Sequence, residues 1–229
     1  MNETVGEKPT LYLETTIPSY LTAWPMRDVV LLAQQQLTRE WWENHCGRFQ
    51  VFVSELVLEE AAAGDSDAAR RRFEMLAGMP LLQSTSGAER LAMLYLREIP
   101  LPSKAARDAA HIAIASVHAM DYLVTWNCRH IAHGEVRRAV ENQPARGATR
   151  ADDLHASGVD GRSAMNDPIV EEVRAAGTRL FEASGNDLHK FFEILRRNER
   201  SRGVALVNRS TEPSAGATVS SRETATADV

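Results

Sequence analysis

Three carboxylates and one carboxamide lie near the ends of predicted strands or the starts of predicted helices. They are Glu14, Glu60 (with Glu59 beside it), Asp108 and Asn127. Carboxylates that are brought together repel one another, and a divalent cation between them removes that repulsion. Oxygen ligands suit Mg²⁺ or Mn²⁺, which can bind a scissile phosphate and lower the pKa of an attacking water. The residue types therefore indicate metal-assisted phosphate chemistry, although their spacing alone also allows four unrelated surface positions.

The stretch from 108 to 127 predicts a helix that leads directly into a buried strand. Ile112 and Ala115 recur at helical spacing, and residues 122–125 favour an enclosed strand. Such helix–strand units build α/β proteins with a parallel sheet, in which ligands bind outside the carboxyl ends of the strands. Because Asn127 follows one of these ends, we expect it to lie at the site.

Further strands and helices are predicted along the first two thirds of the chain. Strands are expected at 10–13, 49–53 and 79–82, and helices at 27–45, 54–64, 66–76, 86–97, 104–120 and 135–142. Glu14 follows the first of these strands, so it occupies the same kind of position as Asn127. The alternation of strands and helices predicts an α/β domain over residues 9–142.

The composition narrows the classes of function. The chain has 229 residues and a net charge of −5, which argues against binding nucleic acid over a wide basic face. An acidic site loaded with metal remains compatible with nucleic acid, because the ion neutralises the phosphate. No run approaches the ~20 apolar residues of a membrane span, and the N-terminus has no apolar signal-peptide core. Cys46 and Cys128 are interpreted as free thiols, so we expect a cytoplasmic protein.

The last third of the chain has a different character. Residues 143–166 are rich in small and polar residues and are interpreted as a linker. Residues 167–200 carry two amphipathic helical stripes that are too short to bury themselves, so they need a partner surface. From 201 to 229 the chain is polar and is expected to be a disordered tail.

Residues 9–142 resemble the PIN-domain ribonuclease toxins of the VapC type. The family's acids match Glu14 in YLETTIPSYL, Glu60 in SELVLEEAAAG (with Glu59 as the second choice), and Asp108 in DAAHIAIA. Its fourth position, in LVTWNCRHIA, is Asn127 where Asp is usual. The amide supplies only a neutral oxygen, so three carboxylates remain, enough for one Mg²⁺.

The resemblance implies a three-layer α/β/α fold with a mostly parallel sheet. It also implies a homodimeric, Mg²⁺-dependent endoribonuclease toxin of a type II toxin–antitoxin system, with Mn²⁺ as the alternative ion. Glu14, Glu60 and Asp108 would hold the metal, and Asn127 would complete the catalytic set. A PIN-like module that binds RNA or protein without catalysis is the alternative. Family members commonly finish with an edge strand, and GATRADDLHASG (147–158) does not read as one.

The segment MNDPIVEEVR (165–174), continued by GNDLHKFFEILRRNE, is similar to short antitoxins encoded beside such toxins. We expect residues 167–200 to dock on the toxin-like domain, in the same chain or in a neighbouring one, and to restrain it. A cognate antitoxin acting in trans is the other partner expected. Arg196, Arg197 or Arg200 is predicted to pair with the acidic cluster and exclude the metal.

Five further basic residues lie near the predicted site in the sequence. His130 and His133 are interpreted as surface or capping histidines, because no third metal ligand accompanies them. Lys104, Arg107 and Arg129 are either simply exposed or guide an RNA backbone.

Overall fold

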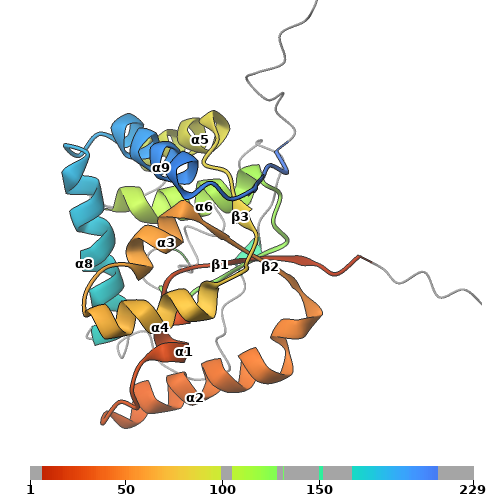
Figure 1. The fold of residues 1–229 in the computed structure, drawn as a ribbon, viewed down its shortest axis with the longest axis vertical. Helices are drawn as coiled ribbons and strands as arrows, with labels where there is room; N and C mark the ends of the chain where they lie inside the picture. The colour runs from red at the N-terminus through yellow and green to blue at the C-terminus, as the bar shows by residue number, and fades with distance from the viewer. Residues whose placement is uncertain (1–6, 99–104, 128–130, 132–149, 152–166, 211–229) are drawn as a thin grey trace, which may run out of the picture.

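A computed structural model describes residues 7–98, 105–127, 131, 150–151 and 167–210 (Figure 1). The helix predicted at 135–142 lies outside these residues, as do Cys128, His130 and His133. None of the helices in the described ranges is long and apolar enough to cross a membrane.

The centre of the fold is a six-stranded sheet in which every neighbouring pair of strands is parallel. Its strand order is β5-β4-β1-β2-β3-β6. The strands are β1 (Thr10–Leu13), β2 (Gln50–Ser54), β3 (Leu81–Leu82), β4 (Tyr122–Val124), β5 (Arg150–Ala151) and β6 (Leu206–Val207). The strands expected at the first four of these positions are confirmed, and β1 lies between β2 and β4.

Strand β1 shows why the chain folds in three layers. Successive side chains of a strand point to opposite faces of the sheet, yet all four residues of β1 are buried. Both faces must therefore be covered by helices, as parallel sheets require. The helices of this part are α1 (Thr16–Thr22), α2 (Val29–Asn44), α3 (Glu55–Ala61), α4 (Ser66–Leu76), α5 (Ser86–Glu98) and α6 (Ala106–Val117), with a short 3₁₀ helix at Cys46–Arg48. The predicted α/β/α architecture is confirmed.

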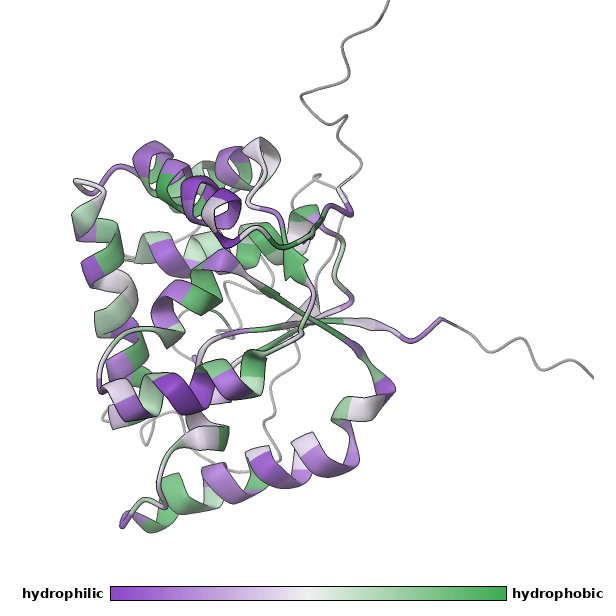
Figure 2. Ribbon diagram, viewed as in Figure 1, coloured by the Kyte–Doolittle hydropathy of each residue, from purple (hydrophilic) through white to green (hydrophobic). Residues whose placement is uncertain are grey.

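The C-terminal segment packs against this core within the same chain. Helix α8 (Pro168–Ala183) contacts α1, α3 and α6, and helix α9 (Leu188–Arg202) contacts α3 and α5 (Figure 1). Phe191, Phe192 and Leu195 of α9 are fully buried. Figure 2 shows hydrophilic residues on α9 where it faces the solvent, and hydrophobic residues on the strand β3 in the sheet. The two amphipathic stripes thus find their partner surface in cis.

Two strands correct the predicted boundaries. Strand β5 lies inside the stretch predicted as a linker and pairs with β4, so the sheet does extend at the edge that 147–158 was expected to leave open. Strand β6 lies inside the stretch predicted as a disordered tail, and α9 itself continues to Arg202. Each strand has only two residues, too few for alternation to show in the sequence. Residues 211–229 lie outside the described part.

Ion pairs attach α9 to the core at α3. Arg202 donates from Nε to both carboxylate oxygens of Glu55, at 2.8 and 2.7 Å, and Asn198 donates to Glu59 at 3.0 Å. Gly203 follows with a φ of +65°, the left-handed conformation that ends helices and favours glycine. The chain then turns into β6, so the Glu55–Arg202 pair fixes the start of the edge strand.

This pair gives the fold a pH dependence. Burial raises the pKa of Glu55 from 4.5 to about 7, although Arg202 partly opposes the shift. A carboxyl whose pKa is raised on folding stabilises the fold fully below its unfolded pKa, and this contribution is lost as the pH rises through the folded value. We expect the unfolding free energy of the wild type, relative to Glu55→Gln, to fall between about pH 4.5 and 7. Chemical denaturation at several pH values measures it, with exposed Glu74→Gln as the control. If the unfolding free energy of the wild type relative to Glu55→Gln stays constant or rises with pH, this expectation is wrong.

Candidate functional site

The structure brings together all four residues predicted for the site. Glu14 follows β1 and Asn127 lies just beyond the adjacent strand β4, while Glu60 comes from α3 and Asp108 from the first turn of α6. Each is at most 2% exposed. Since β1 and β4 are parallel neighbours, their carboxyl ends lie at the same edge of the sheet. The structure therefore places these four residues together, and their role in metal binding and catalysis stays a prediction.

Threonine hydroxyls hold Glu14 in place. Its Oε2 accepts hydrogen bonds from the backbone N–H of Thr16 at 3.0 Å, from the Thr16 hydroxyl and from the Thr125 hydroxyl at 2.8 Å. Burial raises the pKa of Glu14, and the nearby charge of Glu60 adds to the shift, whereas His111 and the hydroxyl donors lower it in part. A cation near Glu14 would relieve the penalty of burying this charge.

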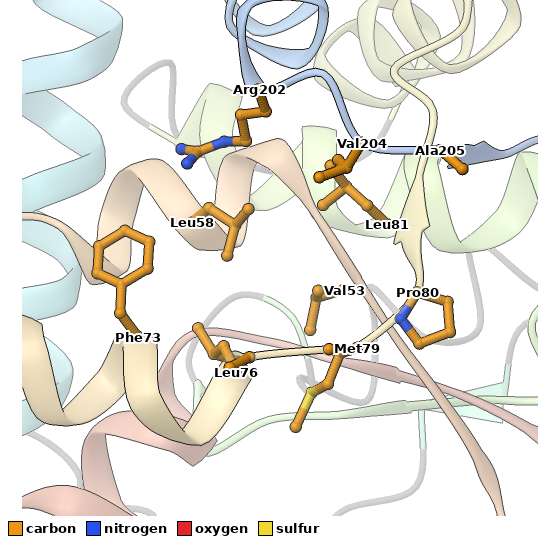
Figure 3. Close-up of a pocket in the computed structure, with 12 residues that line it drawn as sticks. Val53, Leu58, Phe73, Leu76, Met79, Pro80, Leu81, Arg202, Val204 and Ala205 are labelled. Atoms are coloured by element: carbon orange, nitrogen blue, oxygen red, sulfur yellow. The ribbon is translucent and has the colours of Figure 1, made fainter.

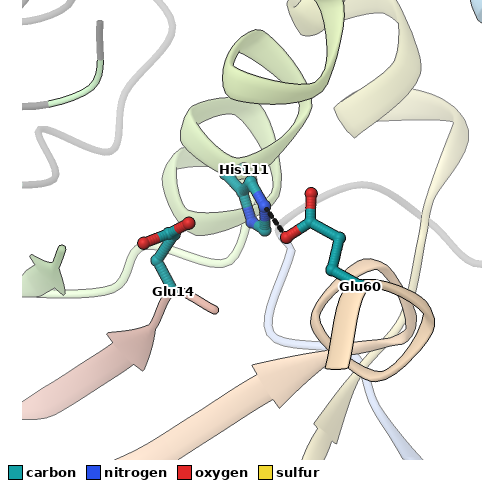
Figure 4. A group of neighbouring side chains, drawn as sticks. All are labelled: Glu14, Glu60 and His111. Carbon is teal, nitrogen blue, oxygen red and sulfur yellow. Dashed lines mark hydrogen bonds and ion pairs between the residues drawn. The ribbon is translucent and has the colours of Figure 1, made fainter. Parts of the chain in front are cut away.

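Glu60, rather than Glu59, faces the site. Its Oε2 lies 3.1 Å from Nε2 of His111 and accepts a hydrogen bond from the hydroxyl of Thr15 (Figure 4). Its Oε1 is buried and accepts no hydrogen bond from the described residues. Glu59 instead points to α9, where it pairs with Asn198. The orientation of α3 therefore directs Glu60 toward the site and Glu59 toward α9.

A guanidinium stands between two of the acids. Arg107 lies 3.3 Å from Oε1 of Glu60 and donates from Nη2 to Oδ1 of Asp108 at 2.9 Å. Its Nη1 donates to the backbone oxygen of Val173, in α8, at 2.7 Å. Arg107 is only 5% exposed, so the expectation that it is simply exposed is wrong, while the alternative that it guides an RNA backbone stays a prediction. Burial lowers the pKa of Arg107, but the attraction of Asp108 and Glu60 outweighs this and raises it, so the group stays charged.

Asn127 links the acidic cluster to the C-terminal segment. Its Nδ2 donates to Oδ1 of Asp108 at 3.0 Å, and its Oδ1 accepts from Nη2 of Arg174, in α8, at 2.9 Å. Arg174 also pairs through Nη1 with Glu171, at 2.5 Å. An amide can donate and accept at once, which an ionised aspartate at this position could not do. The neutral residue thus fits the closed arrangement seen here.

Helix α8 lies directly over the acids, and a glycine permits this approach. A Cβ added at Gly177 would overlap Cδ of Arg107 and lie 2.5 Å from Oε1 of Glu60. Any other residue would force α8 or the buried side chains to move. Arg174 and Gly177 are one turn apart on α8, so the helix covers the cluster through one face.

The arginines predicted to enter the cluster do not do so. Arg196 pairs with Glu89 at 2.8 Å, on the face of α9 that meets α5. In the described part of the chain, the guanidinium groups at the acids belong to Arg107 and, through Asn127, to Arg174. The prediction failed because it relied on a basic helix end, whereas α9 ends beside Glu55 and α8 approaches the site. Lys104 and Arg129 lie outside the described residues.

Several contributors to the site were not identified from the sequence. They are Tyr12, Thr15, Thr16, His111, Thr125, Arg174 and Gly177. His111 had a usable signal, because it follows Asp108 by three residues and therefore shares a face of the same helix. The contribution of α8 depends on long-range packing, which local spacing does not encode.

An apolar pocket lies apart from these acids. It has a volume of about 640 Å³ and lies among α3, α4, β3 and the chain after α9 (Figure 3). Its lining is mostly apolar, with the Arg202 side chain among it, and it includes none of the four predicted site residues. The acidic cluster, and not this pocket, therefore holds the side chains predicted to do chemistry.

Comparison with known proteins adds no assignment. No protein-family model matches this chain, and no curated protein and no solved structure shows significant similarity to it. The function is therefore inferred from the residues of the site.

Proposed function

We propose that the chain is a metal-dependent endoribonuclease of the VapC-like PIN type, fused to its own antitoxin-like inhibitory segment. The single observation that carries this proposal is the gathering of Glu14, Glu60, Asp108 and Asn127 at one edge of a parallel sheet, all buried. Three carboxylates converging in this way are tolerable mainly with a cation among them. RNA is the substrate class that the sequence resemblance implies.

The donor atoms suit a divalent ion. In the open chain, Glu14, Glu60 and Asp108 would hold Mg²⁺ or Mn²⁺. Oε1 of Glu60, which lies 3.3 Å from Arg107 in this structure and accepts no hydrogen bond from the described residues, would be a ligand atom. Such an ion would supply charge neutralisation of the scissile phosphate and a lower pKa for its water. Thr16 and Thr125 keep the Glu14 carboxylate oriented, and Thr15 does the same for Glu60. Asn127 would position Asp108 through its amide.

The position of α8 supports restraint of the acidic site by a segment of the same chain. It lies over the cluster and anchors Arg107 through the oxygen of Val173, so the guanidinium competes with metal for Glu60 and Asp108. Arg174 occupies the oxygen of Asn127 in addition. Loss of α8 would free both arginines and open the acids to metal and to a phosphate backbone.

RNA cleavage by a shortened chain tests the proposal. We expect a chain that ends before Met165 to cleave RNA with Mg²⁺ at least about 10-fold faster than the full chain, because a typical coupling of 1–3 kcal/mol no longer restrains it. Fluorescent single-stranded RNA reports the rate, and circular dichroism establishes that the shortened chain is folded. EDTA, and Asp108→Asn in the shortened chain, should each abolish cleavage.

Asp121→Asn provides a matched control, because Asp121 precedes β4 and binds Thr10 away from the cluster. Cleavage that survives Asp108→Asn, or a folded shortened chain that is inactive in Mg²⁺ and Mn²⁺, contradicts the ribonuclease proposal. Equal rates for the folded shortened and full chains contradict inhibition in cis.

A non-catalytic binding module is the second candidate. The observation that favours it is that Asp108 is engaged by both Arg107 and Asn127, with an amide where the fourth acid is usual. The two candidates differ in metal-dependent melting of the shortened chain. Stabilisation by millimolar Mg²⁺ that Asp108→Asn removes favours the enzyme, whereas RNA binding without any such stabilisation favours the module.

A further inference from the structure

A second ligand set, which includes a nitrogen donor, lies inside the acidic cluster. One oxygen each of Glu14 and Glu60 and one ring nitrogen of His111 all lie within 4.8 Å of one another, and the three side chains are buried (Figure 4). We propose that these residues bind a first-row transition-metal dication, such as Zn²⁺ or Co²⁺, in the closed chain. The proposal goes beyond ribonuclease function, because the site replaces Asp108 by His111 and requires no RNA.

The geometry is close to that of a loaded site. Ligands on opposite sides of such an ion lie about 4.2 Å apart at bond lengths of about 2.1 Å, and neighbouring ligands lie closer. The separation of 3.1 Å between Nε2 of His111 and Oε2 of Glu60 suits neighbouring ligands. In Figure 4 the carboxylates of Glu14 and Glu60 lie on either side of the imidazole. Small side-chain movements would therefore complete the site.

The histidine is oriented as metal-bound histidines usually are. Its Nδ1 lies 2.8 Å from the hydroxyl of Tyr12, which in turn lies 2.7 Å from Oγ of Ser54, and all three residues are fully buried. Such outer partners fix the ring and the position of its proton. Without a metal, Nε2 of His111 hydrogen-bonds to Oε2 of Glu60. A bound cation would take the place of the proton on Nε2, and Nδ1 would keep its hydrogen bond with Tyr12.

The charges of the cluster favour a dication. Glu14 and Glu60 are buried together, burial raises the pKa of Glu14, and the nearby charge of Glu60 adds to that shift. A dication between the two carboxylates would relieve this penalty. Oε1 of Glu60 is buried and accepts no hydrogen bond from the described residues, and Arg107, at 3.3 Å, is the cation with which a bound ion would compete for it.

The donor set selects the kind of ion. Asp108 is held by Arg107 and Asn127 in this closed conformation, so the carboxylates nearest to His111 are those of Glu14 and Glu60. Mg²⁺ prefers oxygen ligands in an octahedral arrangement, whereas imidazole suits Zn²⁺ and Co²⁺. The closed chain is therefore expected to bind these ions more tightly than Mg²⁺.

Titration of the EDTA-treated full chain with Co²⁺, followed by its visible absorption and by calorimetry, tests the site. We expect one ion per chain, and a loss of affinity of about 100-fold for His111→Gln and about 10-fold for Tyr12→Phe. Asp108→Asn should lower the affinity less than His111→Gln does, because Asp108 contributes charge near the ion but is not a ligand here. His118→Gln is the matched control, since His118 is equally buried but binds Gln83 away from the cluster.

The absence of a stoichiometric Co²⁺ site in the folded full chain overturns the proposal. So does binding that Asp108→Asn removes and His111→Gln leaves intact, because the ion then uses the three acids alone. If His111→Gln fails to fold, Tyr12→Phe decides, and an unchanged affinity in that variant rejects the site. RNA cleavage is measured separately, so a Co²⁺ site that requires His111 in a chain without cleavage supports this inference and rejects the proposed ribonuclease.

Discussion

Substitution of Gly177 by valine is expected to switch on RNA cleavage in the full chain. Its Cβ would overlap Cδ of Arg107 and crowd Oε1 of Glu60, both buried beneath α8. Overpacking of this kind costs about 1–3 kcal/mol. Because that cost falls on the closed state alone, the open population and the cleavage rate should rise about 5- to 150-fold. Initial rates with Mg²⁺ and a fluorescent RNA measure the effect.

Ala175→Val is the matched control for this variant, because Ala175 lies on the same helix but is exposed. Hydrogen exchange of the α8 amides gives an independent measure of release, since the amides of residues 169–183 lose protection when the helix leaves the core. If exchange shows α8 released in Gly177→Val while cleavage stays at the level of the control, α8 does not restrain a nuclease. If neither changes, the buried side chains accommodate the new methyl groups and the steric argument is wrong.

The sequence predicted those parts of the fold that depend on local patterns. Helices α2 and α6 have enough residues for their periodicity to show, and β1 and β3 lie in short apolar runs. Residues after β1 and β4 were placed at the site by a general property of parallel sheets. The same reasoning failed for β5 and β6, which lie in stretches that the composition predicted as a linker and a disordered tail, and which pair with β4 and β3 across the sheet.

The sequence predicted the acidic residues at the site but not the arginines that contact them. The acids stand where the topology of the sheet puts them, whereas Arg107 and Arg174 reach the cluster because α8 returns to cover it. A basic helix end suggested Arg196, yet the register of α9 against α5 directs that residue to Glu89. Which arginines reach the cluster therefore depends on how α8 and α9 pack against the core.

Replacement of Arg107 by methionine should lower the free energy of unfolding more than removal of an exposed ion pair does. The change removes the guanidinium from between Glu60 and Asp108, so each of these buried carboxylates loses its ion pair with Arg107. Breaking a buried ion pair by removing one partner costs about 3–5 kcal/mol, and we expect a loss of this size in the free energy of unfolding in EDTA. Urea denaturation measures it. Arg70→Met, which removes exposed pairs, should cost less than about 1 kcal/mol.

Mg²⁺ should then restore stability to Arg107→Met more than to the wild type. An ion present at about 100 times its dissociation constant contributes about 2.7 kcal/mol, and in the variant it no longer competes with a guanidinium for Glu60 and Asp108. A loss equal to that of the Arg70 control contradicts the role of Arg107 as the internal counterion. Equal stabilisation of both proteins by Mg²⁺ contradicts competition, because a cation that displaces Arg107 must gain from its removal.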